Sequence, residues 1–457
     1  MSTRPALPIG RVPEGSLWEK LFPKRVMLSA QDAGTHVHVL GTSSSGKSRW
    51  LASYYLGLVE AGIGVTLIDP HGDLAKLILG KIAQDKPEHL GNTIYLDFKR
   101  AADRSRFLPF NVLKQDGART QVALNILESF HRAWPSLSGG VAPRFDKLVL
   151  NGVKALTAGN GTLPDLSWFL TDKGFRAQVL EHETDNRVLR HWRNWYDKLP
   201  DRLQSEYADS TLSRVDLLSF DEVLRYSLGH EELALNFREV MDRGQHVLVN
   251  LAGLSSQTAR LIGSLFTVMY EQGALSRHDS DVRRTHVAMI DEFARFSAQS
   301  EEAMQTMLSQ TRKYGLFLVM AHQNWTQASD RLRGAMGNAR LKVAFQLDRP
   351  DAQLTALNFT KVDARTIATR EESVVVSVSA SDQVEAITQT LQNLPPRHAL
   401  VKLPDLSVHH IVTEDVLDPD IDVSQIEREQ IERWFKPATI ELPQPTRLPR
   451  LSRVTRD

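Results

Sequence analysis

The chain has 457 residues, a length that predicts more than one domain or one domain with large insertions. Its 55 basic and 55 acidic residues give a formal net charge of zero, which argues against a protein that coats nucleic acid by bulk charge. The absence of cysteine excludes disulfides, thiolate zinc sites and a cysteine nucleophile. No apolar run approaches the ~18 residues that cross a bilayer, and the first residues lack a signal peptide's apolar core. We therefore expect a cytoplasmic protein without a transmembrane segment, peripheral to the inner membrane only through partners.

The pattern of apolar and polar residues changes at residue 34. Residues 1–33 have several prolines and no clear period, so we expect an N-terminal arm with one short hairpin. Residues 34–117 then alternate apolar runs with a helical stretch at 47–60. Three of these runs are typical of buried strands: THVHVL (35–40), GVTLI (64–68) and NTIYLDF (92–98). This alternation predicts an α/β fold with a mainly parallel sheet.

The strand pattern is interrupted between residues 118 and 245. Apolar residues recur there at helical spacing, as in Val122, Ile126 and Phe130, and predict an all-helical insert domain with its own core. The α/β pattern resumes over residues 246–400. Strands are predicted at 246–251, 286–290, 316–321 and 341–347, and helices at 258–272 and 301–314.

Residues 401–457 are rich in proline and charge and are interpreted as a C-terminal extension with a basic Pro/Arg tail. Arg447, Arg450, Arg453 and Arg456 recur every three residues, which a polyproline II helix would place on one side. A solvated tail is the favoured interpretation. A basic strip that engages nucleic acid or an acidic partner surface is the alternative.

The segment GTSSSGKS (41–48) fits the pattern G-x-x-x-x-G-K-[ST] and lies between a predicted strand and a predicted helix. Glycines let the backbone wrap a phosphate, and the loop N–H groups with the following helix N-terminus supply fixed positive dipoles. In such a loop the lysine reaches the β- and γ-phosphates and the next hydroxyl ligates Mg²⁺. The predicted nucleotide-binding residues are Gly41, Thr42, Ser43, Ser44, Ser45, Gly46, Lys47 and Ser48.

Two acidic residues follow the apolar run VAMI (287–290). A buried strand that ends in two carboxylates suits a phosphate site. Asp291 would hold Mg²⁺ through water, and Glu292 would orient or deprotonate the attacking water. Acidic pairs are common after apolar runs, so the prediction depends on the combination with the phosphate loop.

Gln323 follows the next predicted strand and could reach the γ-phosphate, because neighbouring parallel strands end at one edge of a sheet. An amide that caps a loop is the plainer alternative. Arg312 and Lys313 precede the same strand and should lie at the opposite edge. They suit a neighbouring subunit's nucleotide, DNA or simply a solvated helix end.

The turn in IDPHGDLA (68–75) contains His71 between Asp69 and Asp73. No cluster of other ligands accompanies this histidine in the sequence, so a turn that shapes the edge of the nucleotide site is favoured over a metal site.

These elements in this order resemble the HerA/FtsK superfamily of ring-forming DNA motors. The sequence is most similar to conjugative, type IV secretion coupling proteins of the TraD/TraG kind and to their soluble DUF87-type relatives. The resemblance also includes VLVNLAGL (247–254), MIDEFARF (289–296), RKYGLFLVMAHQ (312–323) and NARLKVAFQLDRPDA (338–352). It implies a RecA-like P-loop NTPase fold, ATP and Mg²⁺ as cofactors, and DNA, single- or double-stranded, threaded through a homo-hexamer.

By residue, the resemblance assigns Lys47 and Ser48 to the Walker A motif, Asp291 and Glu292 to Walker B, and Gln323 to the glutamine after the next strand. It also implies a relaxase or a membrane secretion channel as partner. Membrane-bound relatives begin with transmembrane helices, which this chain does not show. Related motors use an arginine from a neighbouring subunit, for which Arg312 is the first candidate and Arg349 the second.

Three functions compete at this point. An ATP-driven DNA translocase is favoured, because the lysine and both Walker B acids are present. A coupling ATPase that recruits or moves protein would use the same residues, with the helical insert as its docking surface. A scaffold that uses nucleotide as a gate is disfavoured by Glu292. The run RVLRHWRNW (187–195) could stack on bases, but an amphipathic helix with buried tryptophan is favoured.

Overall fold

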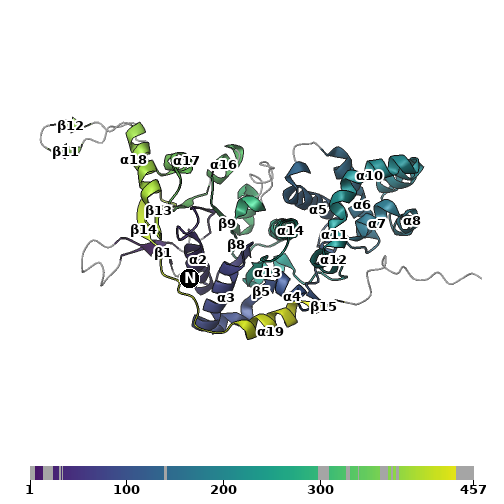
Figure 1. Cartoon of the computed structure of the whole chain (residues 1–457), viewed down its shortest axis with the longest axis horizontal. Coiled ribbons are helices and arrows are strands. Elements are labelled where there is room, and N and C mark those ends of the chain that lie inside the picture. Colours follow the sequence, from purple (N-terminus) through teal and green to yellow (C-terminus); the bar gives the residue numbers. More distant parts are fainter. Residues whose placement is uncertain are drawn as a thin grey trace, which may run out of the picture. The chain divides into compact units, whose positions relative to one another are not determined.

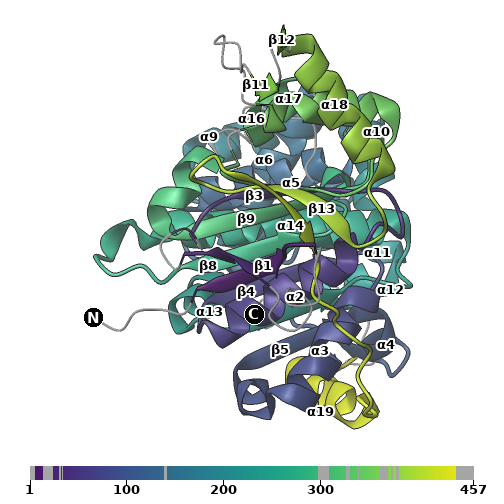
Figure 2. The ribbon, with the colours of Figure 1, turned by 90° about the vertical axis from the view of Figure 1, so that its left-hand side faces the viewer.

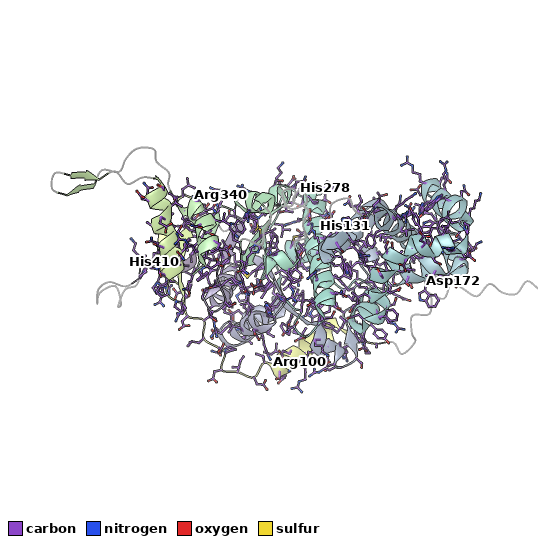
Figure 3. The ribbon with its side chains drawn as sticks, turned by 45° about the horizontal axis from the view of Figure 1, so that its top comes forward. Arg100, His131, Asp172, His278, Arg340 and His410 are labelled. Carbon is purple, nitrogen blue, oxygen red and sulfur yellow. The ribbon has the colours of Figure 1, made fainter. Side chains whose placement is uncertain are left out.

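The computed structural model describes residues 6–13, 24–29, 32, 34–137, 142–296, 308–325, 330–337, 339–360, 369–371, 374–376 and 380–438. The chain forms two compact units. Unit 1 comprises Met1–Tyr95, Arg238–Asn250 and Gly273–Val423, and unit 2 comprises Leu96–Phe237, Leu251–Gln272 and Ser424–Asp457. Figures 1 and 2 label the helices and strands, and Figure 3 adds the side chains.

Eleven strands form the main sheet. They are β1 (Leu7–Arg11), β2 (Arg25–Leu28), β3 (Val37–Leu40), β4 (Gly64–Asp69), β5 (Thr93–Asp97), β7 (His246–Asn250), β8 (His286–Ile290), β9 (Leu316–His322), β10 (Leu341–Ala344), β13 (His398–Lys402) and β14 (Val408–Val412). Their order is β2-β1-β14-β13-β10-β3-β9-β8-β4-β7-β5. The pairings from β10 through β7 are parallel, whereas β13, β14, β1 and β2 extend the sheet antiparallel. The mainly parallel α/β sheet predicted from the sequence is confirmed.

Every residue of β3, β4, β8 and β9 is buried, and these four strands lie side by side in Figure 2. Continuous apolar runs suit strands that are covered on both faces, as in parallel sheets with helical crossovers. Neither face of a strand in such a sheet is in contact with water, so apolar side chains are favoured on both faces. These strands were therefore the elements most easily predicted from the sequence.

Unit 1 also contains helices on several stretches of the chain. They are α2 (Lys47–Glu60), α3 (Asp73–Asp85), α13 (Phe237–Arg243), α16 (Asp330–Gly337), α17 (Arg349–Phe359) and α18 (Ala380–Asn393), with short 3-10 turns η1 (Pro87–Asn92), η6 (Ser276–Asp279), η7 (Phe293–Arg295) and η8 (Thr311–Tyr314). The Trp50 ring of α2 stacks on Tyr54 at 5.0 Å, and its indole N–H donates to the Ile9 carbonyl at 2.9 Å. The beginning of the predicted arm is thus packed on α2 and paired into the sheet.

Unit 2 is helical. Its helices are α4 (Phe98–Ala102), α5 (Arg119–Ala133), α6 (Pro143–Ala158), α7 (Asp165–Thr171), α8 (Lys173–Val179), α9 (Asn186–Leu189), α10 (Asp201–Val215), α11 (Leu217–Phe220), α12 (Glu222–Leu228), α14 (Ser256–Leu275, to Gln272) and α19 (Ser424–Trp434), with the single turns η2 (Val112–Lys114), η3 (Pro135–Leu137), η4 (Arg190–Trp195) and η5 (Tyr196–Lys198). The described part of the stretch from Arg119 to Phe237 holds no strand, so the all-helical insert is confirmed. Two short pairs complete the strands, β11 (Thr369–Glu371) with β12 (Val374–Val376) and β6 (Arg106–Phe107) with β15 (Lys436–Pro437).

Unit 2 holds its helices together with apolar packing and buried ion pairs. On α5, the Arg132 guanidinium donates to Glu271 of α14 at 3.1 Å, and both residues are buried. Burial raises the pKa of Glu271, while the adjacent Arg132 opposes that rise. On η4, Trp192 is fully buried against Phe169, at 4.8 Å between ring centroids.

Several predicted bounds differ from the observed ones. The predicted boundary at residue 400 falls inside β13, and both β13 and β14 belong to the main sheet. Unit 2 also takes α14 and α19 from outside the predicted insert. In the helix predicted at 301–314, residues 311–314 form the 3-10 turn η8, and residues 301–307 lie outside the described residues, as does the tail 441–457.

Candidate nucleotide site

The loop at 41–48 connects β3 to α2, and at two of its glycines there is no room for a Cβ. Gly46 has a φ of 105°, and a Cβ there would lie 2.9 Å from the Arg397 Cα. A Cβ on Gly41 would lie 2.7 Å from the Ser45 Oγ. The left-handed region is open to glycine without steric cost. The two glycines of the motif are therefore required by this backbone.

Bonds within the loop and to neighbouring strands fix its path. The Ser45 hydroxyl donates to the Thr42 carbonyl at 2.7 Å, and the Thr42 N–H donates to the Gln346 carbonyl at 3.1 Å. Helix α2 begins at Lys47 with no side-chain cap. Uncapped N–H groups at a helix start, beside a loop of this shape, form an anion-binding concavity.

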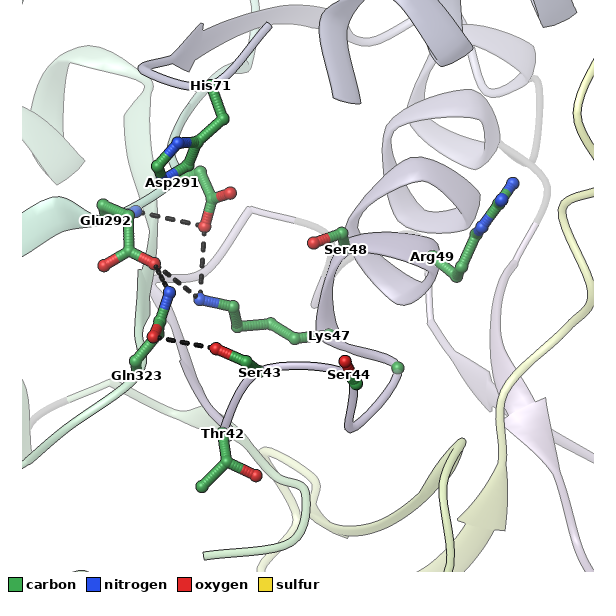
Figure 4. Close-up of a pocket in the computed structure, with 11 residues that line it drawn as sticks. Thr42, Ser43, Ser44, Lys47, Ser48, Arg49, His71, Asp291, Glu292 and Gln323 are labelled. Atoms are coloured by element: carbon green, nitrogen blue, oxygen red, sulfur yellow. Dashed lines mark hydrogen bonds and ion pairs between the residues drawn. The ribbon is translucent and has the colours of Figure 1, made fainter. Parts of the chain in front are cut away.

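Four side chains from three stretches of the chain meet beside this loop (Figure 4). The Lys47 Nζ lies 3.4 Å from the Asp291 carboxylate and 3.3 Å from the Glu292 carboxylate. The Gln323 amide donates to Glu292 at 2.6 Å and accepts from the Ser43 hydroxyl at 3.2 Å. The side chains of Lys47 and Asp291 are each only 7% exposed, so their opposite charges are screened less than surface charges.

The sheet explains how these residues come together. Asp69 ends β4, Asp291 follows β8, and Gln323 follows β9, and these neighbouring strands run parallel. Their carboxyl ends therefore share one edge with the end of β3, where the loop begins. Glu292 has a φ of 50°, a left-handed conformation that turns the chain immediately after the strand.

Asp69 shapes the turn after β4. Its carboxylate accepts the N–H groups of His71 at 2.8 Å and Ala75 at 2.9 Å. Burial raises the pKa of Asp69, the backbone N–H groups oppose that rise, and the nearby Asp291 adds to it. The turn places His71 at the cavity (Figure 4). In the described ranges, no group of three or more His, Asp and Glu residues is placed to hold a metal ion.

These residues line a cavity of about 330 Å³. Its lining comprises Thr42, Ser43, Ser44, Gly46, Lys47, Ser48, Arg49, His71, Asp291, Glu292 and Gln323. Of the predicted nucleotide-binding residues, Gly41 and Ser45 are the two that do not line it. Ser45 is buried, and its carbonyl accepts the Arg397 N–H at 2.8 Å.

Arg312 lies elsewhere. It is exposed on η8, at the start of β9, whereas Gln323 follows the end of that strand. Arg349, the second candidate for a trans-acting arginine, begins α17 and pairs with Glu385 at 3.3 Å. Neither arginine lines the cavity.

Sequence reasoning missed a segment at residues 413–423, which we call the strap. Arg397, which precedes it, pairs with Asp415 of the strap at 3.1 Å. Arg49, one residue after the motif, donates to the Val416 carbonyl at 2.5 Å and to Asp418 at 2.9 Å. The position of Arg49 directly after Ser48 was the one signal that could have marked it. Nothing in the sequence marked its partners, which lie more than 360 residues later.

The run at 187–195 is an amphipathic segment with a buried tryptophan rather than an open stacking surface. Trp192 is buried, and Arg190 and Arg193 are exposed. The Trp195 ring stacks on His191 at 4.9 Å, and the Lys147 Nζ lies 4.2 Å from its centroid. Two neighbours therefore already contact the ring that a base would stack on.

Comparison with solved structures shows the class of fold. An unbound form of the bacterial conjugative coupling protein TrwB is 14% identical, with a TM-score of 0.59 over 90% of this chain and 95% of that one. The plasmid coupling protein TrwB in complex with ADP and Mg²⁺ matches with the same identity, TM-score and coverage. VirB4 of Thermoanaerobacter pseudethanolicus is 13% identical, with a TM-score of 0.56 over 90% of this chain and 96% of that one. No family model and no curated protein matches the sequence.

The fold is therefore the RecA-like P-loop NTPase fold that the resemblance implied. Its likeness extends over nearly the whole of TrwB and VirB4 as solved. Among the residues that the structure describes, no helix is both long and apolar enough to span a membrane.

Proposed function

We propose that this chain is an ATPase that drives DNA movement as part of a ring of subunits, six in number. One observation carries the proposal: Lys47, the adjacent Asp291 and Glu292, and Gln323, from three stretches of the sequence, line one cavity beside a phosphate-binding loop. The fold it shares with a plasmid coupling protein supports the same activity.

The residues of the cavity fit ATP with Mg²⁺. The loop backbone at Gly46 leaves no room for a Cβ, and the start of α2 presents uncapped N–H groups. Ser48 and Asp291 offer the oxygen ligands that Mg²⁺ prefers. When bound there, the ion would supply charge stabilisation on the phosphate oxygens.

Each side chain has a role in hydrolysis. Lys47 neutralises charge on the β- and γ-phosphates. Glu292 accepts a proton from the attacking water, whose oxygen bonds to the γ-phosphorus as the bond to the bridging oxygen breaks and ADP leaves. The proton then passes from Glu292 to solvent. Gln323 holds the Glu292 carboxylate and contacts Ser43, so it joins the general base to the loop.

Arg49 is the one arginine in the lining of this cavity. The ring supplies a further arginine from a neighbouring subunit. Arg312 is exposed at the opposite end of β9 from Gln323, where a neighbouring subunit's nucleotide could be reached. DNA is the proposed substrate. Movement of a protein is the second candidate, and the covered Trp195 ring favours it over base stacking by the helical unit.

The test is the steady-state ATPase rate of the wild type and of Glu292→Gln, without nucleic acid, with single- or double-stranded DNA, and with heparin as a polyanion control. We expect DNA but not heparin to raise the wild-type rate, and sedimentation to show a six-subunit particle. Glu292→Gln should lower the rate by roughly 10²- to 10⁴-fold while still binding a nucleotide analogue. Equal turnover in the two proteins would remove Glu292 from its role, and indifference to DNA would favour a protein substrate.

A further inference from the structure

A second cavity, of about 470 Å³, adjoins the first one in unit 1. His71, Glu292 and Gln323 line both cavities. The second is further lined by Arg295, His322 and Asn324. The two spaces therefore meet at the carboxylate and amide that the proposed function places at the γ-phosphate.

Three of the four side chains that line only the second cavity carry N–H groups, and the fourth is the methyl group of Ala294. Arg295 offers a guanidinium fork and Asn324 an exposed amide. Arg and amide groups are the donors that match a phosphate oxyanion. The first cavity adds the Lys47 ammonium and the Asp291 carboxylate, whereas Glu292 borders both cavities.

His322 adds an unusual feature to the second cavity. It is only 2% exposed, and its Nε2 has no hydrogen-bond partner among the described residues. Burial, with a further contribution from the Lys47 charge, lowers the pKa of His322 to about 3. The ring is thus neutral near pH 7 and adds no positive charge to the cavity. Its Nε2 is closed off from solvent.

We propose that this second cavity holds the inorganic phosphate formed by hydrolysis before it leaves the protein, with Arg295 and Asn324 as its donors. The inference rests on the proposed function for the origin of the phosphate. The cleaved group need only move past Glu292 and Gln323 to enter, because these residues border both cavities. The Glu292 carboxylate repels a phosphate dianion, so the site suits a short-lived product.

Binding can be measured without turnover. Inorganic phosphate is titrated calorimetrically into the full chain with saturating ADP and Mg²⁺, in the wild type and in Arg295→Ala, Arg295→Lys and Asn324→Ala. We expect the phosphate affinity to fall roughly tenfold or more in Arg295→Ala, and less in the other two, since one charge-assisted contact is lost. Affinity for a non-hydrolysable ATP analogue should stay within about twofold, because Arg295 does not line the first cavity.

Arg284→Ala is the matched control, since Arg284 is an exposed arginine at the start of β8 that lines neither cavity. It should bind phosphate as the wild type does. Wild-type protein that hydrolyses ATP but binds no phosphate, or binds it equally after Arg295→Ala and Asn324→Ala, would overturn the inference. A wild type that binds phosphate through Arg295 but hydrolyses no ATP would leave this anion site standing and refute the proposed function instead.

Discussion

Lys47 has two carboxylate partners in this structure, and they are mutually repulsive without it. Asp291 and Glu292 both lie within 3.4 Å of its Nζ, and the side chains of Lys47 and Asp291 are almost wholly buried. Removing one partner of a buried ionic cluster leaves the others uncompensated, which costs more than the intact cluster contributes. The residue proposed to bind phosphate thus also stabilises the folded chain.

We expect Lys47→Met to lower the free energy of unfolding by about 1–3 kcal/mol, because two carboxylates lose their cation. Combining it with Glu292→Gln should restore part of the loss, since one negative charge is removed. Urea unfolding of the wild type, both single variants and the double variant gives the coupling energy. Strictly additive effects would mean that the three side chains do not act as a cluster.

Gly46 is the second residue whose replacement has a defined cost. Alanine at a φ of 105° is strained, and its Cβ would meet the Arg397 backbone at 2.9 Å. We expect Gly46→Ala to lose about 1–3 kcal/mol from strain alone and to bind a nucleotide analogue poorly.

Gly117→Ala is its matched control, because Gly117 has a φ of 119° but no atom within 4 Å of the place that a Cβ would take. Thermal unfolding and analogue binding should show a smaller stability loss and unchanged affinity in Gly117→Ala. Similar affinities in both variants would argue against the role of the close approach to Arg397.

At the scale of elements, the strap joins the loop to the end of the main sheet. Arg397 contacts the loop through Ser45 and the strap through Asp415, and Arg49 contacts Asp418. Asp415 and Asp418 are 52% and 78% exposed, so each pair contributes at most about 1 kcal/mol to folding. Their effect should appear in the cavity, where Arg49 is held, more than in overall stability.

We expect the double variant Asp415→Asn/Asp418→Asn to weaken binding of a nucleotide analogue by roughly two- to fivefold, because Arg49 and Arg397 lose their anchors. The free energy of unfolding should change by under about 1 kcal/mol. Asp85→Asn, which breaks the Lys81–Asp85 pair on α3, is the control. Equal analogue affinity in the double variant and the control would show that the strap does not act on the loop.

The elements differ in how well the sequence predicts them. Strands β3, β4, β8 and β9 are fully buried, and their unbroken apolar runs fall between turn residues. Strands β13 and β14 were missed, because HALVK and VHHIV mix apolar residues with lysine and histidine and lie near prolines. These strands are half covered, and partial burial gives no continuous run to detect.

The residues of the candidate site also differ in how well the sequence predicts them. The motifs identify Lys47, Asp291 and Glu292, since their chemistry needs those residues at those spacings. Arg397 and the strap were not predictable, because only the folded chain brings Arg397 to Gly46 and the strap to Arg49. His322, which follows the strand predicted at 316–321, was not singled out, and its unpartnered nitrogen is visible only in three dimensions.

At the scale of the whole molecule, buried histidines should lower the free energy of unfolding at acid pH. Burial lowers the pKa of His246 to about 4 and that of His286 to about 3, from an ordinary value of 6.5. The unfolded chain therefore binds protons between pH 6.5 and these values while the folded chain does not. Protonation then favours unfolding, so each such histidine stabilises the fold above pH 6.5 and loses that contribution as the pH falls towards 3–4.

We expect the urea midpoint of the wild type to fall steadily from about pH 6.5 to pH 4. Each histidine should give the free energy of unfolding a slope of up to ~1.4 kcal/mol per pH unit over this range. His246→Phe should flatten this slope, because a group that cannot be protonated replaces one that can. Replacing the exposed His278 by asparagine should leave the slope as it is. A wild-type midpoint that does not change over this range would contradict the assignment of neutral buried rings.

The bond between Arg397 and Ser45 also bears on how the protein is made. On the ribosome the phosphate loop emerges long before Arg397, which holds it, and before Val416, which accepts from Arg49 367 residues earlier. Domains generally fold as units during synthesis. The loop of a nascent chain should therefore bind ATP less tightly until Arg397 and the strap have emerged, so that unfinished polypeptides hold less nucleotide.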